Sequence, residues 1–464
     1  MTTKKLVPLA LVLAFALACG RTPSIPAVMD LSEEGIPSYV PSAENLASRE
    51  DFRDSRLGIF IHWGVYSMLG GGECIMQEKD IDYKDYSQLP AGFCPSRFSA
   101  EEWVSAIRNS GARYVTFTSR HVDGFSMFSS SMSSYNIVDA TPFARDVVGE
   151  LAEECHRQGL RLHLYYSLED WGRGDCPQGK TMVNTCGKDP SEEDYPHYLD
   201  FMCGQLTELL TNYGQIGCIW FDCDWDQIRK PAPGEDVVVN FDWKYDRIYS
   251  LVHELQPGCL IGNNHHRGSI AGEDIQIFER DVPGENTSGF SRTGFVARDL
   301  PLETCQTMNG SWGYNILDKN FKSTEDIIRL LVKTAGRDAN LLLNVGPQPD
   351  GRFPEESLRI LAGLGRWMKA NGETIYGTRA TMLPPQEWGV VTHKEKRLFV
   401  HVLEKPLDGK ICLSLEEFPG QMRSVKEFAS GKPLSFSSGN DGISLSLPDD
   451  ADSSIDYIIE IDFI

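Results

Sequence analysis

Short apolar segments alternate with amphipathic segments along most of the chain. The apolar segments are rich in β-branched and aromatic residues and lack a polar alternation, which is typical of parallel strands covered on both faces. We expect eight such strands, at residues 58–63, 114–119, 160–167, 216–222, 259–264, 275–279, near 303–307, and at 340–346.

Apolar residues recur at helical spacing between several of these segments. One stripe consists of Val147, Val148, Leu151, Ala152 and Cys155, and a second of Leu199, Met202, Leu206, Leu209 and Tyr213. Ser323 and Asp326 have the spacing of a capping box ahead of an apolar run at 327–332. The alternation of strands and helices predicts the α/β class, and eight strands over about 300 residues favour a TIM-like (β/α)8 barrel over an open sheet.

The pattern changes after residue 376. Short alternating runs at 389–392, 398–403 and 443–447 are separated by turn residues, which is typical of a small β-sandwich. We therefore predict a barrel domain at 46–378 and a C-terminal β-sandwich at 379–464, whose expected role is to buttress the barrel, with sugar binding as the alternative.

The beginning of the chain has the features of an export signal. Two lysines precede an apolar stretch that is too short to span a bilayer and that ends at Ala16-Leu17-Ala18-Cys19. This ending resembles a bacterial lipobox. We expect residues 1–19 to be a lipoprotein signal peptide and residues 20–45 a linker, with the protein anchored through Cys19 in the periplasm of a Gram-negative cell envelope. Cleavage without lipidation and an uncleaved anchor are the alternatives.

The formal charge of −22 argues against nucleic-acid binding, because a phosphate backbone is bound by clusters of Lys and Arg. The charge is compatible with a neutral substrate such as a sugar. No glycine-rich phosphate loop opens a helix, and no GxSxG turn lies near a histidine-bearing strand. Nucleotide chemistry and serine-hydrolase chemistry are therefore disfavoured.

The twelve cysteines do not predict a metal site, since no CxxC or Cys/His cluster has zinc spacing. Cys176 and Cys186 flank a polar loop and could form a disulfide. Asp222, Asp224 and Asp226 are spaced like the start of a calcium loop, but the positions of its glycine and its closing glutamate hold other residue types. We expect neither a metal nor an organic cofactor.

Polar and aromatic residues follow the ends of the predicted strands. The carboxyl ends of barrel strands form one face, where (β/α)8 enzymes place their reactive groups. These ends carry His62-Trp63, Arg120-His121, Tyr165-Tyr166, Trp220-Phe221-Asp222, Asn263-Asn264-His265-His266 and Glu279-Arg280-Asp281. Carboxylates beside aromatic rings and histidines suit glycoside hydrolysis, in which one carboxylate attacks or stabilises an oxocarbenium-like centre and the other protonates the leaving oxygen.

Ordered blocks of sequence carry a resemblance to a known family. They lie at 57–64, 120–125, 165–167, 220–222, 303–305, 311–314, 341–347 and 371–376. In this order they resemble the α-L-fucosidases of glycoside hydrolase family 29, over about residues 50–380. The resemblance implies a retaining enzyme that releases terminal α-linked L-fucose from oligosaccharides or glycoconjugates without a cofactor.

The same resemblance implies the two catalytic carboxylates. The aspartate of the Trp220-Phe221-Asp222 block corresponds to the nucleophile. The acid/base is not assigned by one motif, and three glutamates stay open. We favour Glu279, at the end of the sixth strand, over Glu303, and Glu303 over Glu285. The carboxyl groups of a retaining pair lie about 5–5.5 Å apart, so tertiary structure should rank them.

The sugar pocket is also implied by the resemblance. Residues expected to bind the substrate are His62, His121, Tyr166, Trp220, Trp312, Glu73 and His265. Trp312 is expected to face the C5 methyl of fucose, because an aromatic wall suits an apolar group.

The chain departs from the family at a few of these positions. Val122 replaces the second of two adjacent histidines, Cys74 replaces an aromatic residue and Cys223 a glycine. His265 and His266 stand where an arginine is usual after the fifth strand. Two alternatives therefore remain beside an active α-L-fucosidase: a glycosidase of the same fold for another sugar, and a catalytically silent glycan-binding protein.

Overall fold

The computed structural model describes residues 35–177, 194–224, 228–229, 239–291, 294–416, 418, 420–439 and 442–464. The predicted signal peptide and most of the predicted linker lie outside these residues, as does Cys186. No helix in the described ranges is long and apolar enough to cross a membrane.

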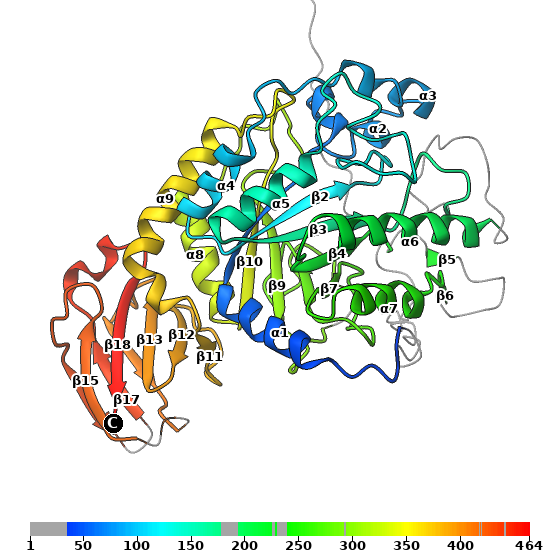
Figure 1. Ribbon diagram of the computed structural model, residues 1–464. Coiled ribbons are helices and arrows are strands. Elements are labelled where there is room, and N and C mark those ends of the chain that lie inside the picture. Colours follow the sequence, from blue (N-terminus) through cyan, green and yellow to red (C-terminus); the bar gives the residue numbers. More distant parts are fainter. Residues whose placement is uncertain are drawn as a thin grey trace, which may run out of the picture.

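Eight parallel strands form a nearly closed barrel (Figure 1). In order around it they are β1 (Leu57–Ile61), β2 (Tyr114–Arg120), β3 (Arg161–Ser167), β4 (Cys218–Asp222), β7 (Leu260–Asn263), β8 (Gln276–Glu279), β9 (Leu302–Thr307) and β10 (Ala339–Val345). β10 pairs with β1, and a parallel bridge between Gly262 and Ile275 links β7 to β8. The predicted barrel is confirmed, and each predicted strand overlaps an observed one.

Helices surround the barrel strands in Figure 1. They are α4 (Ala100–Asn109), α5 (Val147–Gln158), α6 (Tyr195–Asn212), α7 (Tyr245–Leu255), α8 (Thr324–Ala335) and α9 (Glu355–Asn371), while α1 (Ala43–Ser55) precedes β1. The first two predicted apolar stripes lie on α5 and α6, where their residues are largely buried. The predicted capping box of Ser323 and Asp326 begins α8.

Shorter elements lie in the connections. After β1 the chain forms η2 (Val65–Leu69), α2 (Ile75–Glu78), α3 (Tyr83–Tyr86) and η3 (Leu89–Gly92), and a small ribbon of β5 (Ile228–Arg229) and β6 (Val239–Asn240) follows β4. The described parts of the chain between β7 and β9 contain no helix. Residues in these irregular connections are therefore free to approach the barrel mouth.

A β-sandwich follows the barrel, joined to it through η5 (Gly372–Thr374). One sheet contains β11 (Arg379–Ala380), β12 (Gly389–Lys394), β13 (Arg397–Val402), β18 (Tyr457–Phe463) and β15 (Met422–Glu427). The other contains β14 (Lys410–Leu413), β17 (Gly442–Ser446) and β16 (Phe436–Gly439), and η6 (Asp449–Ser453) precedes β18.

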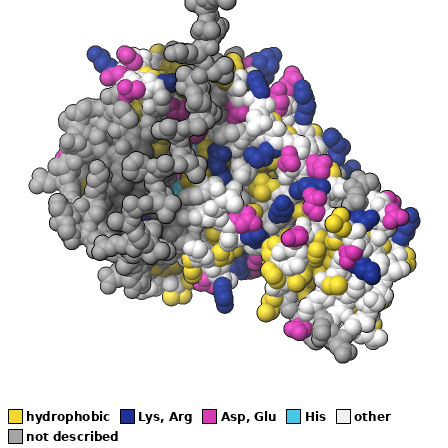
Figure 2. Space-filling model, turned by 180° about the vertical axis from the view of Figure 1, so that it is seen from behind, with side chains coloured by type: hydrophobic (Ala, Val, Ile, Leu, Met, Phe, Trp, Pro, Cys, Tyr) yellow, Lys and Arg dark blue, Asp and Glu magenta, His cyan; other side chains and the backbone are white. Residues whose placement is uncertain are grey.

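The sandwich packs closely on the outer helices of the barrel. Gly336 ends α8, and a Cβ atom added there would lie 2.5 Å from the Cβ of Val390 on β12. Thr392 donates a hydrogen bond to the carbonyl of Thr374 in η5 (3.3 Å). Figure 2 shows apolar side chains gathered on the surface of the sandwich, where Leu407 is fully exposed. The contacts with α8 and η5 make the sandwich a support for the side of the barrel, remote from the strand ends that carry the polar residues.

Candidate active site

The carboxyl ends of the barrel strands surround a pocket of about 190 Å³. Seven of the ten predicted site residues line it: His62, Glu73, His121, Trp220, Asp222, Glu279 and Trp312. They come from six connections or strand ends that are distant in sequence. The barrel thus brings together what the sequence separates, as in other enzymes of this architecture.

Asp222 ends β4 and lines the pocket. Its Oδ2 accepts a hydrogen bond from the hydroxyl of Tyr165 (3.0 Å), and its Oδ1 accepts one from the side-chain amide of Asn264 (3.2 Å). Burial, and then the charge of Glu279, raise the pKa of Asp222 to about 6. This carboxylate is positioned by neutral donors and has no ion-pair partner among the described residues.

Glu279 ends β8 and faces the same pocket. Its Oε2 accepts hydrogen bonds from the amide of Asn264 (2.9 Å) and contacts Nε2 of His266 (3.0 Å). Nε of Arg280 lies 4.0 Å from Oε1. Burial acts to raise the pKa of Glu279, but the contacts with His266, Asn264 and Arg280 outweigh it and lower the pKa.

One nitrogen atom therefore holds both carboxylates. Nδ2 of Asn264 carries two hydrogens, and it lies within hydrogen-bonding distance of both Asp222 and Glu279. Two oxygens that lie 3.2 Å and 2.9 Å from the same nitrogen are at most about 6 Å apart, so the two carboxyl groups are neighbours at the cavity. Neighbouring carboxyl groups are compatible with a retaining pair.

Two buried histidines also line the pocket. Nδ1 of His62 lies 2.7 Å from Oδ1 of Asn344, and the ring of His121 stacks on Tyr165 at 5.5 Å. Burial lowers the pKa of His62 and lowers that of His121 to about 3. Both rings are therefore neutral at ordinary pH. A neutral imidazole can donate to or accept from a sugar hydroxyl.

Aromatic rings supply the apolar wall. Phe60 meets Trp220 edge-on at 5.1 Å and Trp312 at 6.0 Å. The guanidinium of Arg280 lies over Trp312 at 5.1 Å. Glu73 is held by the backbone N–H of Gly313 (2.7 Å), which fixes its carboxylate at the pocket wall.

Two predicted binding residues do not face the pocket. Tyr166 points to the outside of the barrel, where its hydroxyl donates to Gln205 (2.8 Å). Successive side chains on a strand point to opposite faces, and Tyr165 is the one that faces Asp222. The register of β3 with β4 pairs Tyr165 with Trp220. Tyr166 therefore does not have the position expected of a substrate-binding residue, and Tyr165 contacts Asp222 instead.

His265 is also directed away from the pocket. Its Nε2 contacts Glu273 (2.9 Å), and its Nδ1 accepts the backbone N–H of Arg267 (3.0 Å). The next residue, His266, makes the contact with Glu279 instead. Sequence reasoning singled out this pair of histidines but chose the wrong member, because the chain turns sharply at His266 (φ 60°).

The alternative acid/base residues are placed elsewhere. Glu303 lies beneath the pocket floor, fully buried, and accepts hydrogen bonds from Tyr114 (2.6 Å) and from Nε1 of Trp220 (2.8 Å). Glu285 pairs with Arg337 at the surface (2.5 Å). Glu279 is therefore the one of the three that shares the cavity with Asp222.

Asn264 and Tyr165 are site residues that the sequence analysis did not assign. Both stand in strand-end clusters that it had recognised as polar or aromatic. Strand alternation indicates that Tyr165 and Tyr166 point to opposite faces of the strand. The register with the next strand decides which of the two faces Asp222. Nothing local distinguishes Asn264 from Asn263, which donates to Tyr249 outside the pocket (2.9 Å).

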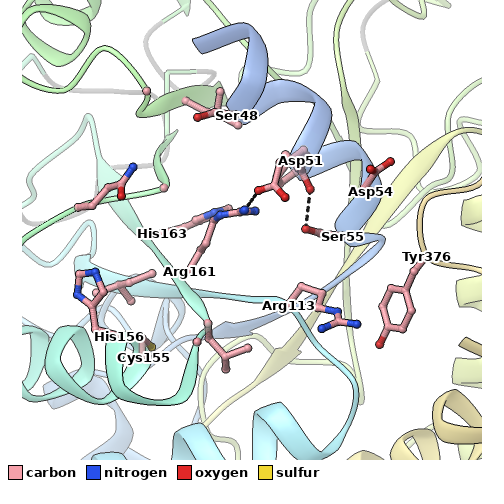
Figure 3. Close-up of a pocket in the computed structure, with 18 of the residues that line it drawn as sticks. Ser48, Asp51, Asp54, Ser55, Arg113, Cys155, His156, Arg161, His163 and Tyr376 are labelled. Atoms are coloured by element: carbon pink, nitrogen blue, oxygen red, sulfur yellow. Dashed lines mark hydrogen bonds and ion pairs between the residues drawn. The ribbon is translucent and has the colours of Figure 1, made fainter. Parts of the chain in front are cut away.

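A larger groove of about 560 Å³ lies at the opposite, amino-terminal end of the strands (Figure 3). Two of its arginines already have partners. Arg161 forms an ion pair with Asp51, and the guanidinium of Arg113 lies 4.4 Å from the ring centre of Tyr376. This end of a (β/α)8 barrel serves stability rather than catalysis. The groove is therefore not the reactive site despite its size.

The described part of the chain contains no group of three or more His, Cys, Asp or Glu residues arranged to hold a metal ion. The cysteines at the site are Cys74, Cys223 and Cys305, and burial raises the pKa of each thiol. Cys176 is a free thiol whose sulfur accepts the backbone N–H of Asp170 (3.2 Å).

Two adjacent carboxylates facing a cavity of the size of one sugar ring, in the mouth of a (β/α)8 barrel, are the apparatus of a glycoside hydrolase. A family model described as alpha-L-fucosidase matches residues 28–373. The chain belongs to the α-L-fucosidase family, as the sequence blocks indicated.

Individual relatives agree with this assignment. The α-L-fucosidase of Dictyostelium discoideum is 28% identical over 409 residues, covering 81% of this chain and 83% of its own length. The plasma α-L-fucosidase of Homo sapiens is 28% identical over 452 residues, covering 88% of each. The solved structure of α-L-fucosidase isoenzyme 1 from Paenibacillus thiaminolyticus has a TM-score of 0.76 and 30% identity, covering 91% of this chain and 100% of that one.

Proposed function

We propose that this α-L-fucosidase cleaves terminal α-linked L-fucose with retention, with Asp222 as the nucleophile and Glu279 as the acid/base. The observation that carries the proposal is the shared amide of Asn264, which holds both carboxylates at one small cavity. Asp222 is assigned as the nucleophile because it ends the Trp220-Phe221-Asp222 block, whose aspartate corresponds to the nucleophile of the family, and because Tyr165 holds it at the cavity.

In the first step, an oxygen of Asp222 attacks the anomeric carbon while the glycosidic C–O bond breaks. The proton of Glu279 passes to the departing oxygen, so that the aglycone leaves as a neutral alcohol and Glu279 becomes a carboxylate. The product on the enzyme is an ester between Asp222 and the sugar. The hydrogen bond from Tyr165 orients Asp222 for this attack.

In the second step, a water molecule attacks the same carbon from the opposite face. Glu279 takes one proton from this water, the ester C–O bond breaks, and Asp222 recovers its negative charge. Two inversions at one carbon give net retention. Water is consumed, and fucose and the alcohol are the products.

The dimensions and lining of the pocket support a single terminal sugar. A cavity of about 190 Å³ has room for one monosaccharide, which is consistent with an exo-acting enzyme. The rings of Phe60 and Trp312 suit the C5 methyl group, and the neutral rings of His62 and His121 suit the hydroxyls. Val122 lines the pocket as an apolar residue, which removes one hydroxyl contact and allows a different sugar as the alternative substrate.

The carboxylate pair must hold one proton to be active. Asp222 loses its proton at a pKa of about 6 in the presence of the charge of Glu279. Above this pH both groups are ionised, and no acid remains for the leaving group. At low pH both groups are protonated, and the nucleophile is lost. When substrate fills the pocket, the positive charge that develops at the anomeric carbon favours the proton on Glu279 and the negative charge on Asp222.

We also propose that the protein is exported and anchored by lipid at Cys19, so that it acts on fucosylated glycans in the cell envelope. Support comes from the lysines, the apolar stretch and the lipobox-like ending of the first 19 residues. Metabolic labelling with palmitate should mark the wild type and leave Cys19→Ala unlabelled. An unlabelled wild type would leave export by plain cleavage as the alternative.

The experiment that tests the residue roles uses azide rescue with an aryl α-L-fucoside. Asp222→Gly with azide should give β-L-fucosyl azide, because azide takes the place of the nucleophile and inverts the centre once. Glu279→Gly with azide should give the α anomer, because the ester on Asp222 still forms and azide then replaces water. Glu303→Gly serves as the control and should give no azide product.

The opposite pair of anomers would exchange the two roles. Absence of turnover on the fucoside by the wild type, with turnover of an aryl β-D-galactoside, would indicate that Val122 has redirected the sugar specificity. Binding of fucose without any turnover, unaffected by Asp222→Asn, would indicate a glycan-binding protein.

A further inference from the structure

His266 is held in an unusual conformation beside the acid/base. Its backbone lies in the left-handed region (φ 60°), which is unfavourable for a residue with a Cβ atom. In this conformation Nε2 of the ring lies 3.0 Å from Oε2 of Glu279. The ring stacks on Phe290 at 5.4 Å with an interplanar angle of 27°. The backbone cost and the stacking together maintain a contact with one carboxylate.

Several charged groups surround His266 and Glu279. They are Asp222 on β4, Arg280 after β8, Arg267 with its partner Asp224, and Asp281 and Glu285, which line a small cavity beside His266. Arg267 is neutralised by Asp224 (2.6 Å), and Asp281 accepts hydrogen bonds from Thr287 and Ser288. Of these groups, Glu279 is the one in direct contact with the imidazole that also faces the reactive cavity.

We propose that His266 is a positioning residue that shares the proton of the acid/base, so that Glu279 and His266 act together as a coupled pair. This inference rests on the assignment of Glu279 in the proposed function. The pair has two arrangements with the same number of protons: a protonated Glu279 beside a neutral imidazole, and a carboxylate beside an imidazolium. The first is the form that donates to the leaving group.

The coupling has a role in both half-reactions. When Glu279 gives its proton to the glycosidic oxygen, its new negative charge is formed beside the N–H of His266, which donates a hydrogen bond to it. In the second half-reaction, Glu279 takes a proton from the attacking water and the same contact weakens. The imidazole thus stabilises the carboxylate where it is formed, and Asn264 supplies the second hydrogen bond.

A partner that titrates and a partner with a fixed charge affect the pH dependence of Glu279 differently. A permanent cation at this position would lower the pKa of Glu279 at every pH, and a neutral amide would keep the hydrogen bond without the charge. A histidine supplies the charge when its ring is protonated and only the hydrogen bond when its ring is neutral. The two substitutions His266→Arg and His266→Gln therefore separate charge from position.

The test measures kcat/KM against pH for the wild type and both variants. The substrates are phenyl α-L-fucoside, which needs an acid to release phenol, and 2,4-dinitrophenyl α-L-fucoside, which does not. His266→Gln should lower kcat on the phenyl substrate by about 10–100-fold and on the dinitrophenyl substrate by less than about threefold. It should move the alkaline limb of the profile to higher pH, whereas His266→Arg should move it to lower pH or leave it in place.

His265→Gln is the matched control, because the same chemical change is made one residue away, on a side chain that contacts Glu273 outside the pocket. It should leave the pH profile and the leaving-group dependence unchanged, whatever it does to the melting temperature. Equal losses on both substrates with an unmoved alkaline limb in His266→Gln would mean that His266 only supports the fold, and would overturn the inference.

Failure of the inference can be told from failure of the proposed function. If Glu279→Gln shows no selective loss on the phenyl substrate, Glu279 is not the acid and the proposed roles fail. If Glu279→Gln shows that loss while the His266 variants leave the profile unmoved, the acid is correctly assigned and only the coupling with His266 is wrong.

Discussion

The two ends of the barrel carry very different arrangements of charge. At the carboxyl end, Asp222 and Glu279 are buried together and are held by an amide, a phenol and an imidazole. At the amino end, Arg161 and Asp51 form an ion pair in which both side chains are about half exposed. The amino-terminal groove is nevertheless the larger cavity, at about 560 Å³ against about 190 Å³.

The difference shows that volume is a poor guide to chemistry in this protein. Two buried like charges destabilise each other, and such an arrangement persists where it serves a reaction. Exposed pairs of opposite charge contribute little to stability, and each charge is already neutralised by its partner. The reactive end is therefore recognised by carboxylates whose charge is stabilised by hydrogen bonds and left available to substrate.

The largest difference between the two ends is expected for the aspartates. Asp222→Asn should reduce kcat on 4-nitrophenyl α-L-fucoside by about 10⁴-fold or more, because an amide cannot form the ester intermediate. Asp51→Asn, in the groove of Figure 3, should keep kcat within about twofold. A comparable loss in Asp51→Asn would show that the groove is coupled to the reaction.

The next largest difference in kcat is expected between a glutamate in the pocket and a glutamate at the surface. Glu279→Gln should lower kcat on phenyl α-L-fucoside by about 10²–10⁴-fold, since the leaving group is no longer protonated. Glu285→Gln removes a surface partner of Arg337 and should change kcat by less than about twofold. Steady-state kinetics on both variants checks the ranking, and a greater loss in Glu285→Gln would reverse it.

Beneath the pocket, Glu303 should make stability depend on pH. Burial raises its pKa to about 7 in the folded state, from 4.5 in an open chain. The folded protein therefore binds the proton more tightly, so stability is highest below pH 4.5 and falls as pH rises to about 7. The fall amounts to about 3 kcal/mol from this group, at about 1.4 kcal/mol per pKa unit.

Glu303→Gln should lack this part of the pH dependence. Thermal unfolding midpoints at pH 4.5 and pH 8 for both proteins measure the difference. If the melting temperatures of the two proteins fall by the same amount between these pH values, folding does not raise the pKa of Glu303.

The carboxylate pair should also set the pH profile of the reaction. Because the pair loses its last proton near the pKa of about 6 of Asp222, kcat/KM on phenyl α-L-fucoside should decline above about pH 6, approaching tenfold per pH unit. Glu279→Gln removes the charge that raises the pKa of Asp222, and its residual activity should lack this decline. A profile in Glu279→Gln identical to that of the wild type would contradict the assignment.

The smallest effect is expected at the amino end. Arg161→Met removes an ion pair between half-exposed side chains and should change the free energy of unfolding by less than about 1 kcal/mol. Urea unfolding at low and at high salt measures this contribution, which should shrink with added salt. A loss of several kcal/mol would show that the groove holds the barrel closed.

The strand pattern was readable from the sequence because burial on both faces leaves a local signature. Each of the eight predicted strands overlaps an observed one, and Asp222 and Glu279 stand at the ends of their strands as expected. The sequence blocks were sufficient for the family, which predicts Asp222 as the nucleophile. These features depend on a residue and its immediate neighbours along the chain.

Which side of a strand or turn faces the substrate was decided only by the tertiary structure. Tyr165 rather than Tyr166 contacts Asp222 because β3 pairs with β4 in the register that places Tyr165 beside Trp220. Among the three glutamates, proximity to Asp222 depends on how β8 and β9 lie around the barrel, and Glu303 is shielded by Trp220.

The same holds for the two histidines after β7. A left-handed backbone at His266 directs its ring to Glu279, while His265 is retained by Glu273. The sequence by itself determined the barrel, its reactive end and the residue types gathered there, since these follow from local periodicity. Contacts between residues far apart in the chain determined which atoms meet, because the register and the backbone turns that set them arise only when the barrel closes.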